Sequence, residues 1–127
     1  MYQAWDDALG KKDLEPSMAL YAPNATLESP LIRHLLGVES GVLEGRDAIR
    51  QFVEKVYQRT PAIRRRFRKG SLTDGRTAMW EYPRAAPNGE QMDFVEVMEI
   101  EDGLIQHHRV YWGWFGHRVL EKDQYRR

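Results

Sequence analysis

Residues 91–115 constrain the fold more than any other part of the chain. Residues 92–100 and 104–115 are rich in β-branched and aromatic side chains in an alternating pattern, which is typical of two paired strands. The sequence Glu101-Asp102-Gly103 lies between them and predicts a tight turn. An antiparallel β-hairpin therefore forms the centre of the predicted fold, and the other segments are expected to pack around it.

The length of the turn decides which side chains share a face, because a shift of one residue moves a whole arm to the opposite side. A two-residue loop places Glu96 opposite Arg109, whereas a three-residue loop that starts at Glu101 places Glu96 opposite His108. We prefer the three-residue loop, which gives an apolar face that holds an acid and an imidazole. That face consists of Met92, Phe94, Glu96, Met98, Ile100, Leu104, Gln106, His108, Val110, Trp112 and Trp114.

Composition limits the classes of function. With 127 residues the chain is expected to form a single domain over residues 1–127. Its 19 basic and 19 acidic residues give no net charge, which argues against nucleic acid as a partner. The chain has no cysteine, so it has neither disulfides nor a thiolate metal site. No apolar run approaches the length of a membrane span and we identify no signal peptide, so we expect a cytoplasmic protein without membrane contact.

Helices precede strands along the chain, which predicts an α+β fold with a curved antiparallel sheet wrapped around N-terminal helices. The strongest helix is residues 46–59, where apolar residues recur at helical spacing, namely Ile49, Phe52, Val53, Val56 and Tyr57. Shorter helices are expected at residues 1–9 and 14–22, a loop at 31–43, and further strands at 25–29, 63–72 and 77–82.

This order of elements carries a resemblance to a known family. The segments LYAPNATLESP, LEGRDAIRQFV and VEVMEIEDGLIQHHRVYW resemble those of the nuclear-transport-factor-2-like superfamily. That superfamily includes SnoaL-like polyketide cyclases, ketosteroid isomerases and limonene-epoxide-hydrolase-like enzymes. The resemblance implies a conical, cystatin-like barrel, an apolar pocket at its wide end, and a homodimer that packs through the sheet.

The resemblance also suggests roles for individual residues. Ser29 stands where ketosteroid isomerases have their general-base aspartate, and serine cannot replace that base. Trp5 stands at the position of their oxyanion-hole tyrosine, and its indole can still donate one hydrogen bond. Glu96 stands at the position of their second, acidic oxyanion donor. Trp112 matches a pocket tryptophan of the last strand, and Val110 occupies the place of the acid in cyclases and epoxide hydrolases.

The candidate catalytic residues are Glu96 and His108. A carboxyl group in an apolar lining is costly when ionised and needs a partner, and a histidine beside it can relay protons near neutral pH. His34 in the loop and Trp80 in the sheet join Trp5, Ser29, Val110 and Trp112 as candidate ligand-binding residues. No third metal ligand is expected near His108, so we predict neither a metal nor a cofactor.

Two functions remain open. In the first, the protein is an acid-base enzyme, an isomerase, cyclase, dehydratase or hydratase, for a small apolar and cyclic substrate. In the second, the same pocket binds a small ligand without catalysis, and Glu96 and His108 only satisfy each other. The basic run at residues 64–69 is interpreted as a solvated strand or dimer rim, because charges on a strand divide between two faces.

Overall fold

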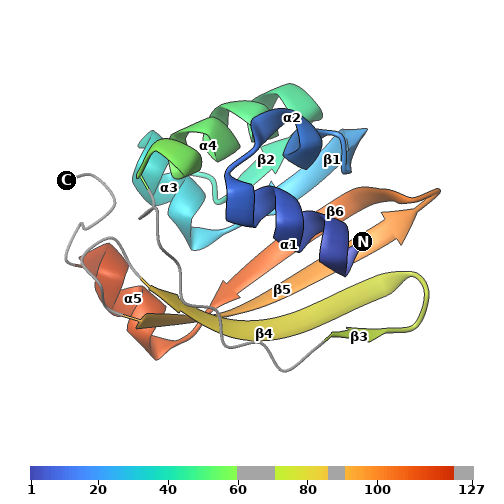
Figure 1. Cartoon of the computed structure of the whole chain (residues 1–127). Coiled ribbons are helices and arrows are strands. Elements are labelled where there is room, and N and C mark those ends of the chain that lie inside the picture. Colours follow the sequence, from blue (N-terminus) through green and yellow to red (C-terminus); the bar gives the residue numbers. More distant parts are fainter. Residues whose placement is uncertain (60–70, 86–90, 122–127) are drawn as a thin grey trace.

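A six-stranded sheet forms one layer of the protein, and helices cover one of its faces (Figure 1). The structure is a computed structural model and describes residues 1–59, 71–85 and 91–121. Strand order is β2-β1-β6-β5-β4-β3 in a curved sheet that does not close into a barrel. The predicted α+β class and curved sheet are confirmed. However, β1 and β6 run parallel, so the sheet is mixed and not purely antiparallel.

The elements in chain order are α1 (Tyr2–Lys11), α2 (Leu14–Met18), β1 (Tyr21–Glu28), α3 (Pro30–Leu36), β2 (Val42–Glu44), α4 (Arg46–Arg59), β3 (Leu72–Thr73), β4 (Thr77–Ala85), β5 (Gln91–Glu101), β6 (Leu104–Trp112) and α5 (Trp114–Glu121).

Helix α4 has the predicted bounds and buries the predicted side of the helix. Ile49, Phe52 and Val56 are all less than a tenth exposed and belong to the hydrophobic core. This core lies between the sheet and helices α1, α2, α3 and α4. None of the described helices is both long enough and apolar enough to span a bilayer.

The N-terminal segments differ from their predicted bounds. Helix α1 continues through Gly10 and is closed by Lys12, which has a left-handed φ of 51°. Helix α2 ends at Met18, because Tyr21 already pairs with Ile105 of β6 and takes the chain into the sheet. Strand β1 is therefore longer than predicted, and Tyr21 belongs to a strand and not to a helix.

Helix α3 replaces most of the predicted loop. The Ser29 hydroxyl accepts a hydrogen bond from the Leu31 amide at 3.2 Å, and Pro30 fills the first turn, where it needs no amide donor. Gly37, with a φ of 69°, ends the helix. The sequence analysis expected a strand up to residue 29 and a loop from residue 31, but the proline between them begins a helix.

Two other differences concern the second half of the chain. Helix α5 starts where the second hairpin arm was predicted to continue, so Trp114 is 67% exposed and does not face inward. Most of the predicted strand 63–72 lies outside the described residues, which include only β3 at its end.

The hairpin has the two-residue turn that we did not prefer. Asp102 and Gly103 have φ values of 53° and 76°, as a type I′ turn requires. Glu101 accordingly pairs with Leu104. The three-residue loop is therefore wrong.

A one-residue bulge next to the turn nevertheless restores the predicted faces. Ile100 pairs with Ile105, but Glu99 pairs with His107, so Gln106 is an additional residue in β6. Beyond it Glu96 lies opposite Val110, and not opposite His108 or Arg109 as our two alternatives required. This register differs from the preferred one by two residues, so the same side chains share the inner face.

Candidate functional site

Glu96 and His108 lie in adjacent cross-strand rows on the inner face of the sheet. Glu96 is flanked by Trp80 on β4 and Val110 on β6, and His108 by Met98 on β5 and Leu27 on β1. The two side chains are therefore diagonal neighbours, which long side chains can bridge. Both residues are only 4% exposed.

The two groups are in direct contact. His108 Nε2 and Glu96 Oε2 form a hydrogen bond between the buried side chains. The prediction that these residues meet on one face is thus confirmed, through a register that the sequence did not reveal.

Tyr21 adds a third member that the sequence analysis missed. Its hydroxyl lies 2.8 Å from His108 Nδ1, so both ring nitrogens of His108 have a partner. The Trp5 indole in turn forms a hydrogen bond with the Tyr21 hydroxyl. Tyr21 falls within the helix that was predicted at residues 14–22, and its pairing with the distant strand β6 left no local signal.

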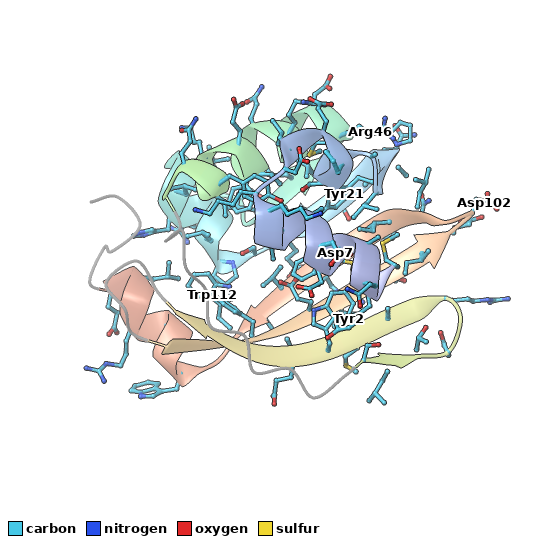
Figure 2. The ribbon with its side chains drawn as sticks, viewed as in Figure 1. Tyr2, Asp7, Tyr21, Arg46, Asp102 and Trp112 are labelled. Carbon is cyan, nitrogen blue, oxygen red and sulfur yellow. The ribbon has the colours of Figure 1, made fainter. Side chains whose placement is uncertain are left out.

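Arg46 holds the backbone of Tyr21 where β1 enters the sheet. Its guanidinium Nε and Nη2 donate to the Tyr21 carbonyl oxygen at 3.0 and 2.5 Å. Pairing between β1 and β6 is irregular from Tyr21 to Thr26, so this carbonyl is satisfied by Arg46 at the first residue of α4. Figure 2 labels Tyr21 and Arg46 close together near the start of β1.

The environment of Tyr21 keeps its hydroxyl protonated. Burial raises its pKa well above the usual value, the negative charge of Glu96 raises it further, and the hydrogen bond from Trp5 offsets only part of the effect. Tyr21 therefore acts as a neutral hydrogen-bonding group in this site.

This raised pKa leads to a test at alkaline pH. The unfolded chain loses the tyrosine proton above about pH 10 while the folded protein keeps it, so the contribution to stability is complete below that pH and falls as pH rises. We expect the unfolding free energy of the wild type to decline up to about 1.4 kcal/mol per pH unit more steeply than that of Tyr21→Phe. Urea unfolding between pH 9 and 11, followed by tryptophan fluorescence, measures both slopes. Equal slopes for wild type and Tyr21→Phe would contradict the assignment.

An apolar cavity opens beside these groups. It has a volume of about 80 Å³ and lies between the sheet and helices α1, α3 and α4. The lining residues are Trp5, Leu9, Tyr21, Leu27, Ser29, Leu31, Phe52, Val53, Val56, Tyr57, Phe94, Glu96, His108, Val110 and Trp112.

The polar wall groups differ in what they can offer a ligand. Ser29 accepts from the Leu31 amide, and the described residues provide no acceptor for its own hydroxyl proton, which leaves a donor for the cavity. The Tyr57 hydroxyl lies 2.5 Å from Ser17 Oγ. Since Ser17 Oγ donates to the Asp13 carbonyl at 2.6 Å, Tyr57 donates to Ser17.

Comparison with protein families matches the SnoaL-like domain to residues 2–108 of the sequence. The chain belongs to this family. A search of curated proteins gave no match.

Solved structures share the fold of this SnoaL-like domain at low sequence identity. An NTF2-like protein of unknown function from Burkholderia pseudomallei has a TM-score of 0.74 at 20% identity, over 93% of this chain and 91% of its own. A putative ketosteroid isomerase from Kribbella flavida has a TM-score of 0.68 at 22% identity, with 88% and 74% covered. A putative polyketide cyclase from Sinorhizobium meliloti has a TM-score of 0.69 at 18% identity, with 87% and 92% covered.

The structure brings most of the predicted site residues of this SnoaL-like domain to one cavity. Glu96, His108, Trp5, Ser29, Val110 and Trp112 all line it. His34 on α3 and Trp80 on β4 do not.

Trp80 contributes to the core instead. It is 2% exposed, and its ring contacts those of Tyr2 and Trp5 at centroid distances of 4.9 and 5.2 Å. Its indole nitrogen has no hydrogen-bond partner among the described residues.

Helix α5 supports the Trp112 wall of the cavity. The Trp112 ring lies edge-on to Phe94 with centroids 5.0 Å apart. On its other side Gly116 packs so closely that a Cβ there would approach the ring to 2.9 Å. Figure 2 places Trp112 at the end of the sheet next to α5.

Metal ligands do not cluster in the part of the chain that the structure describes. No group of three or more histidine, aspartate or glutamate side chains there is arranged to hold a metal ion. His107, the neighbour of His108, faces the other side and contacts Thr26 Oγ1 through Nδ1 at 2.7 Å.

Proposed function

We propose that this protein is a cofactor-independent acid-base enzyme, an isomerase or a lyase, with Glu96 as the proton-transferring group. The supporting observation is a buried carboxyl group, hydrogen-bonded to an imidazole, in the wall of an apolar cavity. The names of the similar structures, a putative ketosteroid isomerase and a putative polyketide cyclase, agree with this class of chemistry.

The lining of the cavity favours an uncharged, apolar substrate. Of the described residues, no lysine or arginine lines it, so an anionic substrate would gain no ion pair and would be repelled by ionised Glu96. Aromatic and aliphatic side chains form most of the wall, which suits a cyclic hydrocarbon frame.

In the proposed reaction Glu96 takes a proton from a carbon atom next to a carbonyl group. An isomerase returns this proton to another atom of the substrate, whereas in a lyase the proton removal is followed by departure of a leaving group. The Ser29 hydroxyl is the available donor for the oxygen on which negative charge develops. Trp5, which we expected to fill that role, is occupied by Tyr21.

The size of the cavity limits how a substrate binds. A volume of about 80 Å³ is smaller than that of an apolar protein cavity of about 150 Å³ that holds benzene. The cavity in this form encloses only the reacting end of a ring. The second candidate, a ligand-binding domain without catalysis, is supported by the hydrogen bond through which Glu96 and His108 satisfy each other.

Proton exchange separates the two candidates without knowledge of the natural substrate. Small cyclic ketones and enones are incubated with the protein in D₂O, and NMR follows both ligand binding and loss of the α-proton signals. The enzyme proposal expects exchange that depends on folded protein. Binding without exchange for every bound ketone would favour the second candidate.

We also propose that two copies associate through the outer face of the sheet, which none of the described helices covers (Figure 1). Tyr111 and Met79 are 51% and 40% exposed there, and Val95 and Val97 lie between them on β5. This apolar surface is rimmed by the Arg109–Glu99 ion pair, so a second copy could match both its apolar centre and its charges. Light scattering at micromolar concentration should give a dimer, and Tyr111→Asp should give a monomer. A monomeric wild type would contradict this proposal.

A further inference from the structure

Four buried side chains form a hydrogen-bonded series whose direction can be assigned. The series begins at the Trp5 indole, passes through the Tyr21 hydroxyl and His108, and ends at Glu96. An indole nitrogen can only donate, so Tyr21 accepts from Trp5. The hydroxyl of Tyr21 then has one proton to donate, and His108 Nδ1 is the acceptor at 2.8 Å.

The other end of the series leads to the same assignment. The ionised form of the Glu96 carboxyl group can only accept, and in that form the proton between Glu96 and His108 belongs to Nε2. A neutral imidazole carries one donor and one acceptor, and the acceptor nitrogen is then Nδ1. The opposite arrangement would place two donors on the Tyr21 oxygen and leave its own proton without an acceptor among the described residues.

We infer that Tyr21 is a positioning residue that fixes His108 as the neutral tautomer with its proton on Nε2. His108 then donates to Glu96 and has no lone pair left for a substrate. Of these two residues, only Glu96 therefore has lone pairs that can receive a proton from the substrate. This last step depends on the proposed function, whereas the tautomer does not.

The surroundings of Tyr21 suit this role. Tyr21, His108 and Glu96 are each 4% exposed, so water does not compete strongly for their hydrogen bonds. The backbone of Tyr21 is fixed by the guanidinium of Arg46, and the adjacent Leu20 carbonyl accepts from the Ile105 amide at 2.8 Å. A tyrosine hydroxyl is protonated at neutral pH, and burial raises the pKa of Tyr21 further, so it is a hydrogen-bond donor there.

The tautomer can be observed directly by NMR of protein labelled with ¹⁵N at histidine. The chain has four histidines, and His108→Gln identifies the signals of His108 by their absence. We expect a pyridine-type shift for Nδ1 and a pyrrole-type shift for Nε2 in the wild type at neutral pH. In Tyr21→Phe, Nδ1 loses its hydrogen-bond donor, so the Nδ1 signal should shift while Glu96 still holds the proton on Nε2.

The neighbouring histidine offers a matched control. Thr26 Oγ1 contacts His107 Nδ1 at 2.7 Å, the same kind of contact at an exposed position on the other face. Thr26→Ala should change only the His107 signals. The proposal is overturned if His108 of the wild type carries its proton on Nδ1 or on both nitrogens, or if Tyr21→Phe leaves the Nδ1 signal unchanged.

The rate of proton exchange on a ketone provides a second test, which asks whether His108 positions Glu96 or transfers the proton itself. Gln at position 108 can accept from Tyr21 through its carbonyl and donate to Glu96 through its amide, but cannot carry a proton. We expect His108→Leu to lower the exchange rate by about 10²-fold or more and His108→Gln to recover at least about tenfold of that loss. Equal losses would show that His108 itself transfers the proton. If no ketone is exchanged but the expected tautomer is found, the proposed function fails while the role of Tyr21 stands.

Discussion

Glu96→Gln is expected to keep the fold and to lower protein-dependent proton exchange by about 10²–10⁴-fold, the range for loss of a general acid-base group. Glutamine has nearly the same shape, and its carbonyl can still accept from His108 Nε2. We therefore expect the unfolding free energy to change by no more than about 1–1.5 kcal/mol. The exchange assay in D₂O and urea unfolding measure the two quantities on the same preparation.

Glu99→Gln is the matched control for this change. Glu99 is on the same strand but faces outward, where it pairs with Arg109 Nη1 at 2.5 Å. The Arg109 hydrogen bond holds the pKa of Glu99 below its usual value, but the residue does not line the cavity. The Glu99→Gln variant should therefore exchange ketone protons at the same rate as the wild type. If Glu96→Gln exchanges protons at close to the parental rate, the carboxyl is not the acid-base group, and His108 becomes the candidate.

Trp80→Ala should have the largest effect on stability. The side chain is 2% exposed and contacts the rings of Tyr2 and Trp5, so its removal leaves a large cavity in the core. Such replacements cost about 3–5 kcal/mol. Trp80→Phe should cost much less, because the ring contacts remain in part and the indole nitrogen has no partner to lose within the described structure. Denaturant unfolding monitored by circular dichroism gives both values.

Leu72→Ala serves as the control, since Leu72 is 73% exposed and its truncation should change stability by less than about 0.5 kcal/mol. The stability of Trp80→Ala would also decide whether Trp80 belongs to the ligand site, as the sequence suggested. If Trp80→Ala costs less than about 1 kcal/mol but abolishes binding of a ketone, the residue is a ligand contact and not part of the core.

Local sequence patterns predicted the helices and strands that are determined by their own residues and not by contacts with distant parts of the chain. Helix α4 was predicted with its bounds because a regular apolar spacing marks it from start to end. Helix α3 was missed because Pro30 serves two local signals at once. Tyr21 was misassigned because it joins the sheet through pairing with a strand more than eighty residues away, and no local pattern reports such a pairing.

The prediction that Glu96 and His108 share a face was correct, but the turn on which it was based was not. The preferred turn was wrong, yet Glu96 and His108 share a face because the Gln106 bulge compensates for the shorter loop. Alternation along each strand indicates which residues belong together but does not reveal where an extra residue enters. The inner-face set was therefore predictable, whereas the exact partner of Glu96 was not.

The separation of the site residues along the chain bears on the order in which the site forms during folding. Glu96 and His108 are 12 positions apart within one hairpin, whereas Tyr21 and His108 are 87 positions apart. Closing the longer loop costs more chain entropy, so contacts of the first kind are expected to form before those of the second. The acid and the imidazole would meet while the hairpin is still incompletely covered by the N-terminal part of the chain. The docking of β1 beside β6 would then be the late step that delivers Tyr21 and excludes water from the pair.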